Sequence, residues 1–292
     1  MISNIKFLVL IQNIMSVQVE KYVLNINGYQ VEYQSSGSGF PLVLIHTRHS
    51  YAKYFLSSLP EGKSYRVITI DIPGYYSVGG KKPVTTIDQF LDLLEALFIK
   101  LNLKEVDLLG ECLGAIIVLQ FAQKYPRRVR KLIAVSPPLR VFGNKFRKTF
   151  GPFFFLLRRS RLAGRTAKAF VRFNLWRGIA AYFGGYRGFW DLFHQETLRV
   201  SKINFDPRVF WGILANLFEI DIKNIVGGVE TETLFILGSK DLMTKKKEIA
   251  KFCREKKNLT LKIISGANHA LVSSHTKQFN SLVTKFLLEG KR

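Results

Sequence analysis

The sequence predicts an α/β fold in which helices cover both faces of a mostly parallel, doubly wound sheet. The chain has 292 residues, which is enough for one large domain of this kind. Runs such as 41–45 and 66–70 are apolar at every position, which is typical of parallel strands buried on both sides. The stretch 87–101 shows a 3.6-residue apolar period, so helices alternate with strands along the chain.

Local signals place the first elements. Alternating runs at 22–26 and 29–33 flank Asn27-Gly28, a dipeptide that strongly predicts a tight hairpin turn. The glycine- and serine-rich stretch 35–39 is expected to form a loop.

Capping signals and apolar runs place the remaining elements. Thr85 with Asp88 resembles a capping box that opens the helix at 87–101. Apolar residues at helical spacing from Phe279 to Phe286 predict a final helix. Further strands are predicted at 106–109, 131–136, 233–237 and 259–264.

A basic and aromatic segment interrupts this alternation, and we interpret it as an inserted helical cap. Seventeen of the 44 basic residues lie between Cys112 and Trp190, and no acidic residue lies there. That segment therefore carries most of the net charge of +23. The predicted organisation is an N-terminal extension of 1–15, a core of 16–138 and 227–292, and a cap of 139–226.

The charge of the cap bears on its partners. Basic residues recur at helical spacing at Arg161, Arg165, Lys168 and Arg172. Such a stripe can rest on an anionic membrane surface, bind an acidic or phosphorylated substrate, or be a solvated face. No nucleic-acid-binding motif accompanies it, so nucleic acid is not an expected partner.

Cysteine usage and apolar content bear on the compartment. Two cysteines, Cys112 and Cys253, do not make a disulfide framework, which favours a reducing compartment. The apolar run at 7–11 is too short to span a membrane. We expect a cytoplasmic protein that can contact the membrane surface through its cap. The sequence contains no dinucleotide fingerprint and no metal-ligand spacing, so neither a cofactor nor a metal is predicted.

The most informative motif is Gly110-Glu111-Cys112-Leu113-Gly114. It follows the strand-like run 106–109 and precedes the helix-like run 115–121, which is the frame of a nucleophile elbow, G-x-Nu-x-G. Glycine suits the flanks because a Cβ would clash in so tight a turn. Cys112 occupies the nucleophile position, at a helix N-terminus that favours an anionic sulfur. The competing interpretation is a small buried cysteine.

Together with this elbow, several other motifs resemble the α/β-hydrolase family. They occur in the order that this family requires, which is nucleophile, acid and histidine. The resemblance covers about 19–288 apart from the cap. The matching stretches are Leu42–His46, Asp71–Tyr75, Tyr125–Val129, Leu132–Ser136, Gly238–Asp241 and Gly266–His269.

The resemblance implies a catalytic triad. Cys112 would be the nucleophile, His269 the residue that exchanges the proton, and Asp241 the group that orients the imidazole. His275 is a rival base, although its place at the start of the final helix favours a surface role. Cys253, in the lysine-rich stretch 245–257, is expected to be structural.

An oxyanion hole and a pocket are also implied. Leu113, directly after the nucleophile, would supply one backbone N–H, and Thr47 or Arg48 the other. Phe146, Phe150 and Trp176 of the cap could line an acyl or aryl pocket, or could form the core of the cap itself.

A cysteine nucleophile narrows the substrates. A thiolate leaves a tetrahedral intermediate more readily than an alkoxide does, so plain alkyl esters tend to revert to substrate. Thioesters, enol lactones and aryl esters can go forward, and dienelactone hydrolases, which resemble this chain at the elbow, are a precedent. The sequence therefore predicts a hydrolase of activated esters or thioesters that forms an acyl-cysteine.

Two alternatives remain open. The same scaffold suits an acyltransferase, in which an acceptor other than water takes the acyl group. The family usually has glycine where Thr47 stands, which favours a second alternative, a catalytically silent binding protein that uses the basic cap at a membrane or partner surface.

Overall fold

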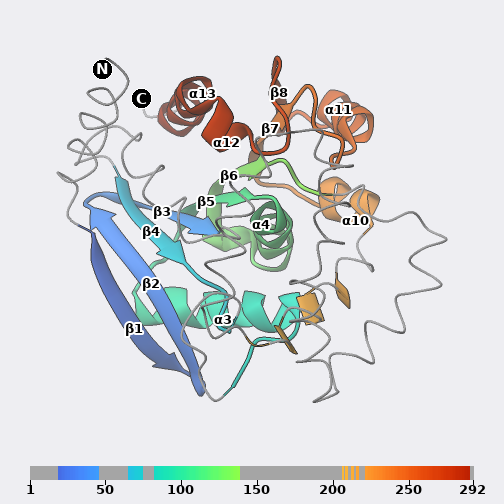
Figure 1. Cartoon of the computed structure of the whole chain (residues 1–292). Helices are drawn as coiled ribbons and strands as arrows, with labels where there is room; N and C mark the ends of the chain where they lie inside the picture. Colours follow the sequence, from blue (N-terminus) through green and yellow to red (C-terminus); the bar gives the residue numbers. More distant parts are fainter. Residues whose placement is uncertain are drawn as a thin grey trace, which may run out of the picture.

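A single eight-stranded sheet organises the described residues (Figure 1). The computed structural model of the chain describes residues 19–45, 65–74, 82–138 and 221–289, together with 206, 208–209, 212–213 and 215–216. The strands are β1 (Glu20–Ile26), β2 (Tyr29–Gly37), β3 (Phe40–Ile45), β4 (Tyr65–Ile70), β5 (Val106–Glu111), β6 (Val129–Val135), β7 (Glu232–Gly238) and β8 (Leu259–Ile264).

The predicted, mostly parallel sheet is confirmed. The strand order is β1-β2-β4-β3-β5-β6-β7-β8. The β1–β2 and β2–β4 pairs are antiparallel, and all pairs from β4–β3 to β7–β8 are parallel. Strands that run the same way end at one edge of the sheet, here called the carboxyl edge, and begin at the opposite amino edge.

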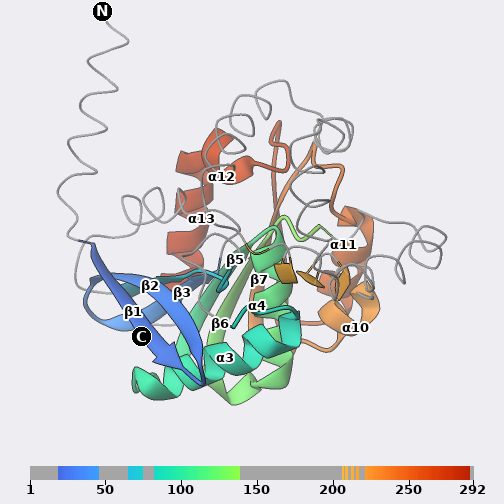
Figure 2. The ribbon, with the colours of Figure 1, turned by 60° about the horizontal axis from the view of Figure 1, so that its bottom comes forward.

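Helices cover both faces of the sheet (Figure 2). One buried apolar cluster joins the sheet to α3, α4, α10 and α11, and a second joins its other face to α12 and α13. In the described part of the chain, no helix is long and apolar enough to cross a membrane. The helices are α3 (Ile87–Lys100), α4 (Leu113–Lys124), α10 (Ile222–Gly227), α11 (Lys246–Glu255), α12 (Leu271–Ser274) and α13 (Thr276–Leu288), with a short 3₁₀ helix at Pro126–Arg128.

The uniformly apolar strands are explained by these two clusters. In β3, Val43 and Ile45 belong to one cluster, whereas Leu42 and Leu44 belong to the other. Because successive side chains of a strand point to opposite faces, a strand between two helical layers needs apolar residues at every position.

The hairpin prediction is confirmed, but the predicted loop at 35–39 is confirmed only at 38–39 and is wrong at 35–37. Asn27 and Gly28 both have positive φ, 53° and 81°, as a tight hairpin turn requires. The stretch 35–37 continues β2 and pairs antiparallel with β4, from Ser35 opposite Ile68 to Gly37 opposite Arg66. Pairing with β4 supplies the hydrogen bonds that override the turn preference of these serines and glycine.

The start of α3 also differs from its prediction. The N-cap is Thr86, whose hydroxyl accepts a hydrogen bond from the backbone N of Gln89 at 3.1 Å. Gln89 in turn accepts a hydrogen bond from the backbone N of Thr85 at 3.0 Å. The N-cap is therefore Thr86 instead of Thr85, a shift of one residue, and the return hydrogen bond of the Gln89 side chain goes to Thr85.

The end of the predicted cap segment lies against the carboxyl edge. The backbone N of Asp206 donates to the carbonyl of Gly74, just after β4, at 2.9 Å. The side chain of Asn216 accepts from the backbone N of Ile87, the first residue of α3, at 2.7 Å. A Cβ on Gly212 would lie 1.9 Å from the carbonyl oxygen of Thr85, so this contact requires glycine.

Candidate active site

The glycine-flanked turn between β5 and α4 holds Cys112 in a strained conformation. Cys112 has φ 54° and ψ −117°, a region that residues with a side chain seldom adopt. A Cβ on Gly110 would lie 2.2 Å from the carbonyl oxygen of Gly114, so the turn closes only with glycine at that flank. The backbone N of Cys112 donates to the carbonyl of Val135 at 2.9 Å, which ties the turn to β6.

This turn places Cys112 at the N-terminus of α4. The cysteine is partly exposed, whereas its neighbours Glu111 and Leu113 are buried. Leu113 is the first residue of α4, so its backbone N–H has no acceptor within the helix. The turn therefore presents a thiol and a backbone donor at the carboxyl edge of the sheet.

The structure brings Asp241 and His269 together. Asp241 lies in the loop after β7 and His269 in the loop after β8, and both side chains are buried. Nδ1 of His269 lies 3.0 Å from Oδ2 of Asp241, and the backbone N of Met243 donates to Oδ1 at 2.8 Å. Burial raises the pKa of the Asp241 carboxyl, but its contacts with His269 and Met243 outweigh burial and lower the pKa overall. An ionised Asp241 accepts a hydrogen bond from Nδ1–H, which keeps the proton on that nitrogen and leaves Nε2 of the same ring for chemistry.

Backbone contacts join the two loops that carry these side chains. The backbone N of Lys240 donates to the carbonyl of Ala267 at 2.8 Å, and the backbone N of Gly266 donates to the hydroxyl of Ser239 at 2.9 Å. A Cβ on Gly238 would lie 2.5 Å from the carbonyl oxygen of Ala267. The close approach of the loops thus depends on a glycine at the end of β7.

His269 also lies close to Cys112. Burial lowers the pKa of His269, but the negative charge of the Cys112 sulfur and the hydrogen bond with Asp241 outweigh it, so the pKa lies well above its ordinary value. Nε2 is buried and has no hydrogen bond of standard geometry with any described residue, Cys112 included. The sulfur is therefore near enough to raise the pKa of the ring, although the pair does not reach the geometry of a standard hydrogen bond.

Ser136 is a residue at this edge to which the sequence analysis assigned no role. It follows β6, is fully buried and has a positive φ of 46°. Its hydroxyl lies close enough to Asp241 to help lower the pKa of that carboxyl, although it makes no hydrogen bond of standard geometry to a described residue. The sequence signal that could have identified Ser136 was its position directly after a buried strand, at the same edge of the sheet as the elbow.

The other predicted residues are placed as follows. His275 is the N-cap residue of α13, and its Nδ1 lies 2.8 Å from the hydroxyl of Ser274. Cys253 is half-buried on α11, where burial raises the pKa of its thiol to about 11.

The described residues contain no group of three or more His, Cys, Asp or Glu placed to hold a metal ion. The predicted residues Thr47, Arg48, Phe146, Phe150 and Trp176, and the basic stripe at 161–172, lie outside the described residues.

Comparisons with known proteins agree with the fold described above. Residues 38–276 match the profile of the alpha/beta hydrolase fold family. A protein assigned as a non-heme chloroperoxidase in Synechocystis sp. is 26% identical over 279 residues, which cover 88% of this chain and 94% of that protein. The 2-hydroxymuconate semialdehyde hydrolase of Pseudomonas sp. is 32% identical over 114 residues, 37% of this chain and 40% of the hydrolase. The crystal structure of a bromoperoxidase from Bacillus anthracis superposes with a TM-score of 0.71 at 21% identity, covering 92% of this chain and all of that one.

Proposed function

The chain belongs to the α/β-hydrolase fold family, and we propose that it hydrolyses activated esters or thioesters through an acyl-cysteine on Cys112. Related proteins with this fold are enzymes, among them a 2-hydroxymuconate semialdehyde hydrolase. The observation that carries the proposal is the buried His269. One ring nitrogen lies 3.0 Å from Asp241, and the ring is close enough to Cys112 for the sulfur to raise its pKa.

The first half of the reaction transfers the acyl group to the enzyme. The Cys112 thiolate attacks the acyl carbon and forms a carbon–sulfur bond, while the carbonyl electron pair moves onto oxygen. The N–H of Leu113 would stabilise that oxyanion. When the carbonyl reforms, the bond to the leaving group breaks, and the His269 imidazolium gives its proton to the departing thiolate or enolate.

The second half regenerates the enzyme. His269, now neutral, takes a proton from water, and the resulting hydroxide attacks the acyl-cysteine. Collapse of the second tetrahedral intermediate releases a carboxylic acid and the Cys112 thiolate, next to a reprotonated His269. Asp241 keeps the proton on Nδ1, so that Nε2 performs both transfers.

The leaving group determines which acyl compounds are suitable. The intermediate expels its better leaving group, and a thiolate departs more readily than an alkoxide. Acyl thioesters, enol lactones and aryl esters are therefore the proposed substrate class, because their leaving groups compete with the cysteine.

The test measures turnover of an aryl ester and a series of acyl thioesters by the purified protein. We expect hydrolysis that is lost in Cys112→Ala, with a plain ethyl ester as a poor substrate for both proteins. Absence of Cys112-dependent turnover on every compound would refute the proposal and favour a silent binding protein. Product analysis with an added alcohol or amine acceptor distinguishes hydrolysis from acyl transfer.

Alkylation supplies a test that needs no substrate. Iodoacetamide at neutral pH, followed by peptide mass spectrometry, compares Cys112 with Cys253 in the same molecule. We expect Cys112 to react much faster, since burial raises the pKa of Cys253 to about 11 and a protonated thiol is a poor nucleophile. Equal rates would count against an activated Cys112.

A further inference from the structure

Lys246, the first residue of α11, binds the loop that carries Asp241. Its Nζ donates to the carbonyl oxygens of Ser239 at 2.9 Å, Gly238 at 3.5 Å and Asp241. A lysine ammonium group has three N–H donors, so these three carbonyls can take up all of them.

The position of Lys246 is not explained by helix stability. Cations are unfavourable in the first turn of a helix, where the backbone N–H groups already form a positive end. The neighbouring Lys245 forms an ordinary exposed ion pair with Glu248 at 3.4 Å. Lys246 instead turns toward three backbone carbonyls of one loop, of which the Gly238 carbonyl also accepts from the backbone N of Asp241 at 3.1 Å.

Hydrogen bonds hold the loop that carries Asp241 from two sides. On one side Lys240 and Ser239 make the hydrogen bonds to the histidine loop described above. On the other side the ammonium group of Lys246 fixes the main chain at the carbonyl of Asp241 itself. The carboxylate of that residue must remain near 3.0 Å from Nδ1 of His269 for the ring to be oriented.

We propose that Lys246 is a positioning residue of the active site, which clamps the loop of Asp241 and through it sets the orientation of His269. This inference rests on the proposed function for its meaning in catalysis, but its geometry can be tested without catalysis. Lys246 touches no reacting atom, so its effect passes entirely through Asp241.

The sign of the change in the His269 pKa distinguishes positioning from simple electrostatics. Asp241 and Cys112 are the titratable groups whose charges raise the pKa of His269. If Lys246→Met only removed a nearby cation, the pKa of His269 would rise. If the variant releases the loop, Asp241 moves away from Nδ1, and the pKa falls.

The experiment measures the pKa of His269 by NMR titration in the wild type, Lys246→Met and Lys246→Arg, with the resonance assigned from His269→Gln. Lys247→Met, an exposed neighbour on the same turn, is the matched control. We expect a lower pKa in Lys246→Met, partial recovery in Lys246→Arg and no change in the control. The rate of Cys112 alkylation near pH 7 should fall in Lys246→Met, because a displaced His269 no longer stabilises the thiolate.

An unchanged or raised pKa in folded Lys246→Met would overturn the inference. If that variant does not fold, Lys246→Leu, which likewise removes all three donors to these carbonyls, replaces it with the same two outcomes. A wild type without activity on any thioester would refute the proposed function, whereas the titration would still decide whether Lys246 positions His269.

Discussion

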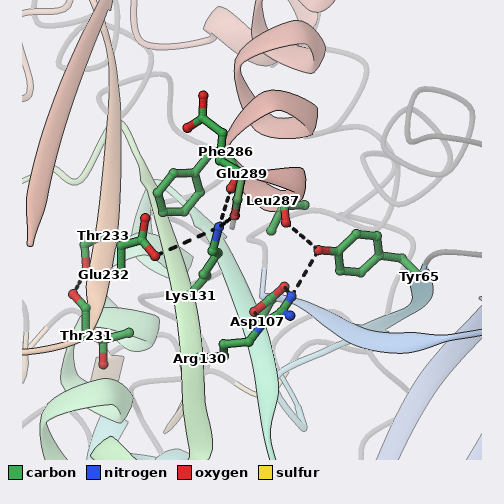
Figure 3. A network of polar contacts seen from close by, with 10 residues as sticks. All are labelled: Tyr65, Asp107, Arg130, Lys131, Thr231, Glu232, Thr233, Phe286, Leu287 and Glu289. Atoms are coloured by element: carbon green, nitrogen blue, oxygen red, sulfur yellow. Dashed lines mark hydrogen bonds and ion pairs between the residues drawn. The ribbon is translucent and has the colours of Figure 1, made fainter. Parts of the chain in front are cut away.

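At the amino edge of the sheet, buried polar groups find partners in one another, whereas at the carboxyl edge several have none among the described residues. Figure 3 shows the amino edge, where Asp107 is fully buried and binds the guanidinium of Arg130 through both oxygens, at 2.9 and 2.5 Å. Arg130 also donates to the Tyr65 hydroxyl at 3.1 Å, which donates to the carbonyl of Leu287 at 3.0 Å. The ammonium group of Lys131 donates to the carbonyl of Phe286 at 2.6 Å.

The carboxyl edge has the opposite character. Nε2 of His269, the hydroxyl of Ser136 and the hydroxyl of Thr244 are buried, and none forms a hydrogen bond to a described residue. Cys112 and Ser136 both have positive φ at this edge. A buried polar group without a partner costs about 1–3 kcal/mol, so such groups persist where they serve a ligand or a reaction.

The difference shows that the polar residues that stabilise the fold lie at the amino ends of the strands, whereas the candidate catalytic residues lie at the carboxyl ends. At the amino edge Tyr65 and Lys131 bind the last carbonyls of α13, which has no further turn to satisfy them. At the carboxyl edge, polar atoms of His269, Ser136 and Thr244 are buried without a hydrogen bond to a described residue. Variants at the two edges should therefore affect different properties.

The largest effect is expected for Cys112→Gly. Activity should fall about 1000-fold or more because the nucleophile is lost. The free energy of unfolding should rise by about 1 kcal/mol, since glycine adopts φ 54° without strain. Turnover assays and urea unfolding measure the two effects. Cys112→Ala is the control, because it removes the sulfur but keeps the Cβ, and an equal gain in stability there would contradict the strain argument.

At the amino edge, Asp107→Ala should do the reverse. It leaves Arg130 without its buried partner and should lower the free energy of unfolding by about 3 kcal/mol. Activity per folded molecule should be unchanged, as measured by active-site titration with an alkylating agent. The exposed pair of Asp92 with Lys124 offers a comparison, where Asp92→Ala should cost less than about 1 kcal/mol. Loss of activity in folded Asp107→Ala would show that the two edges are coupled.

The smallest effect concerns the pH dependence of stability. Because the pKa of His269 is raised in the folded protein, its proton stabilises the fold fully below the unfolded pKa of about 6.5. This contribution is lost as the pH rises through the folded pKa. Urea unfolding should therefore show the advantage of the wild type over His269→Gln shrinking above neutral pH.

Tyr65→Phe supplies the amino-edge control for this measurement. Burial, with a further contribution from Asp107, raises the pKa of Tyr65 to about 12, so the hydroxyl stays protonated through the neutral range. The stability difference between the wild type and Tyr65→Phe should be constant there. An advantage over His269→Gln that grows with pH would contradict the assignment of a raised pKa.

The sequence could predict features that depend on neighbouring residues. Hydrophobic periodicity located the strands and the main helices, because the buried face of an element follows its own spacing. Asn27-Gly28 identified the hairpin turn, which requires a backbone that few residues adopt, and the glycines around Cys112 identified the elbow, where a Cβ on Gly110 would clash. Chain order and loop position were enough to nominate Asp241 and His269.

Local patterns failed where distant segments decided the outcome. The stretch 35–37 looks like a loop but is a strand, because β4 lies beside it and accepts its hydrogen bonds. The N-cap of α3 was misplaced by one residue for a local reason, because the Thr86 hydroxyl binds the backbone N of Gln89 and the Gln89 side chain binds Thr85.

The sequence by itself determined the fold class and the elbow, because both depend on short-range spacing or conformational preference. It also nominated the active-site residues, through the resemblance of short motifs to the α/β-hydrolase family. Only the tertiary structure could show that Nδ1 of His269 lies 3.0 Å from Asp241. These two residues are on the loops after β7 and β8, which are neighbouring strands of the sheet. The tertiary structure alone also distinguished Lys246 from its lysine neighbours at 245 and 247, which share its charge and propensity. What separates them is the direction of one side chain toward three carbonyls, and that direction is set by the packing of α11 against the sheet.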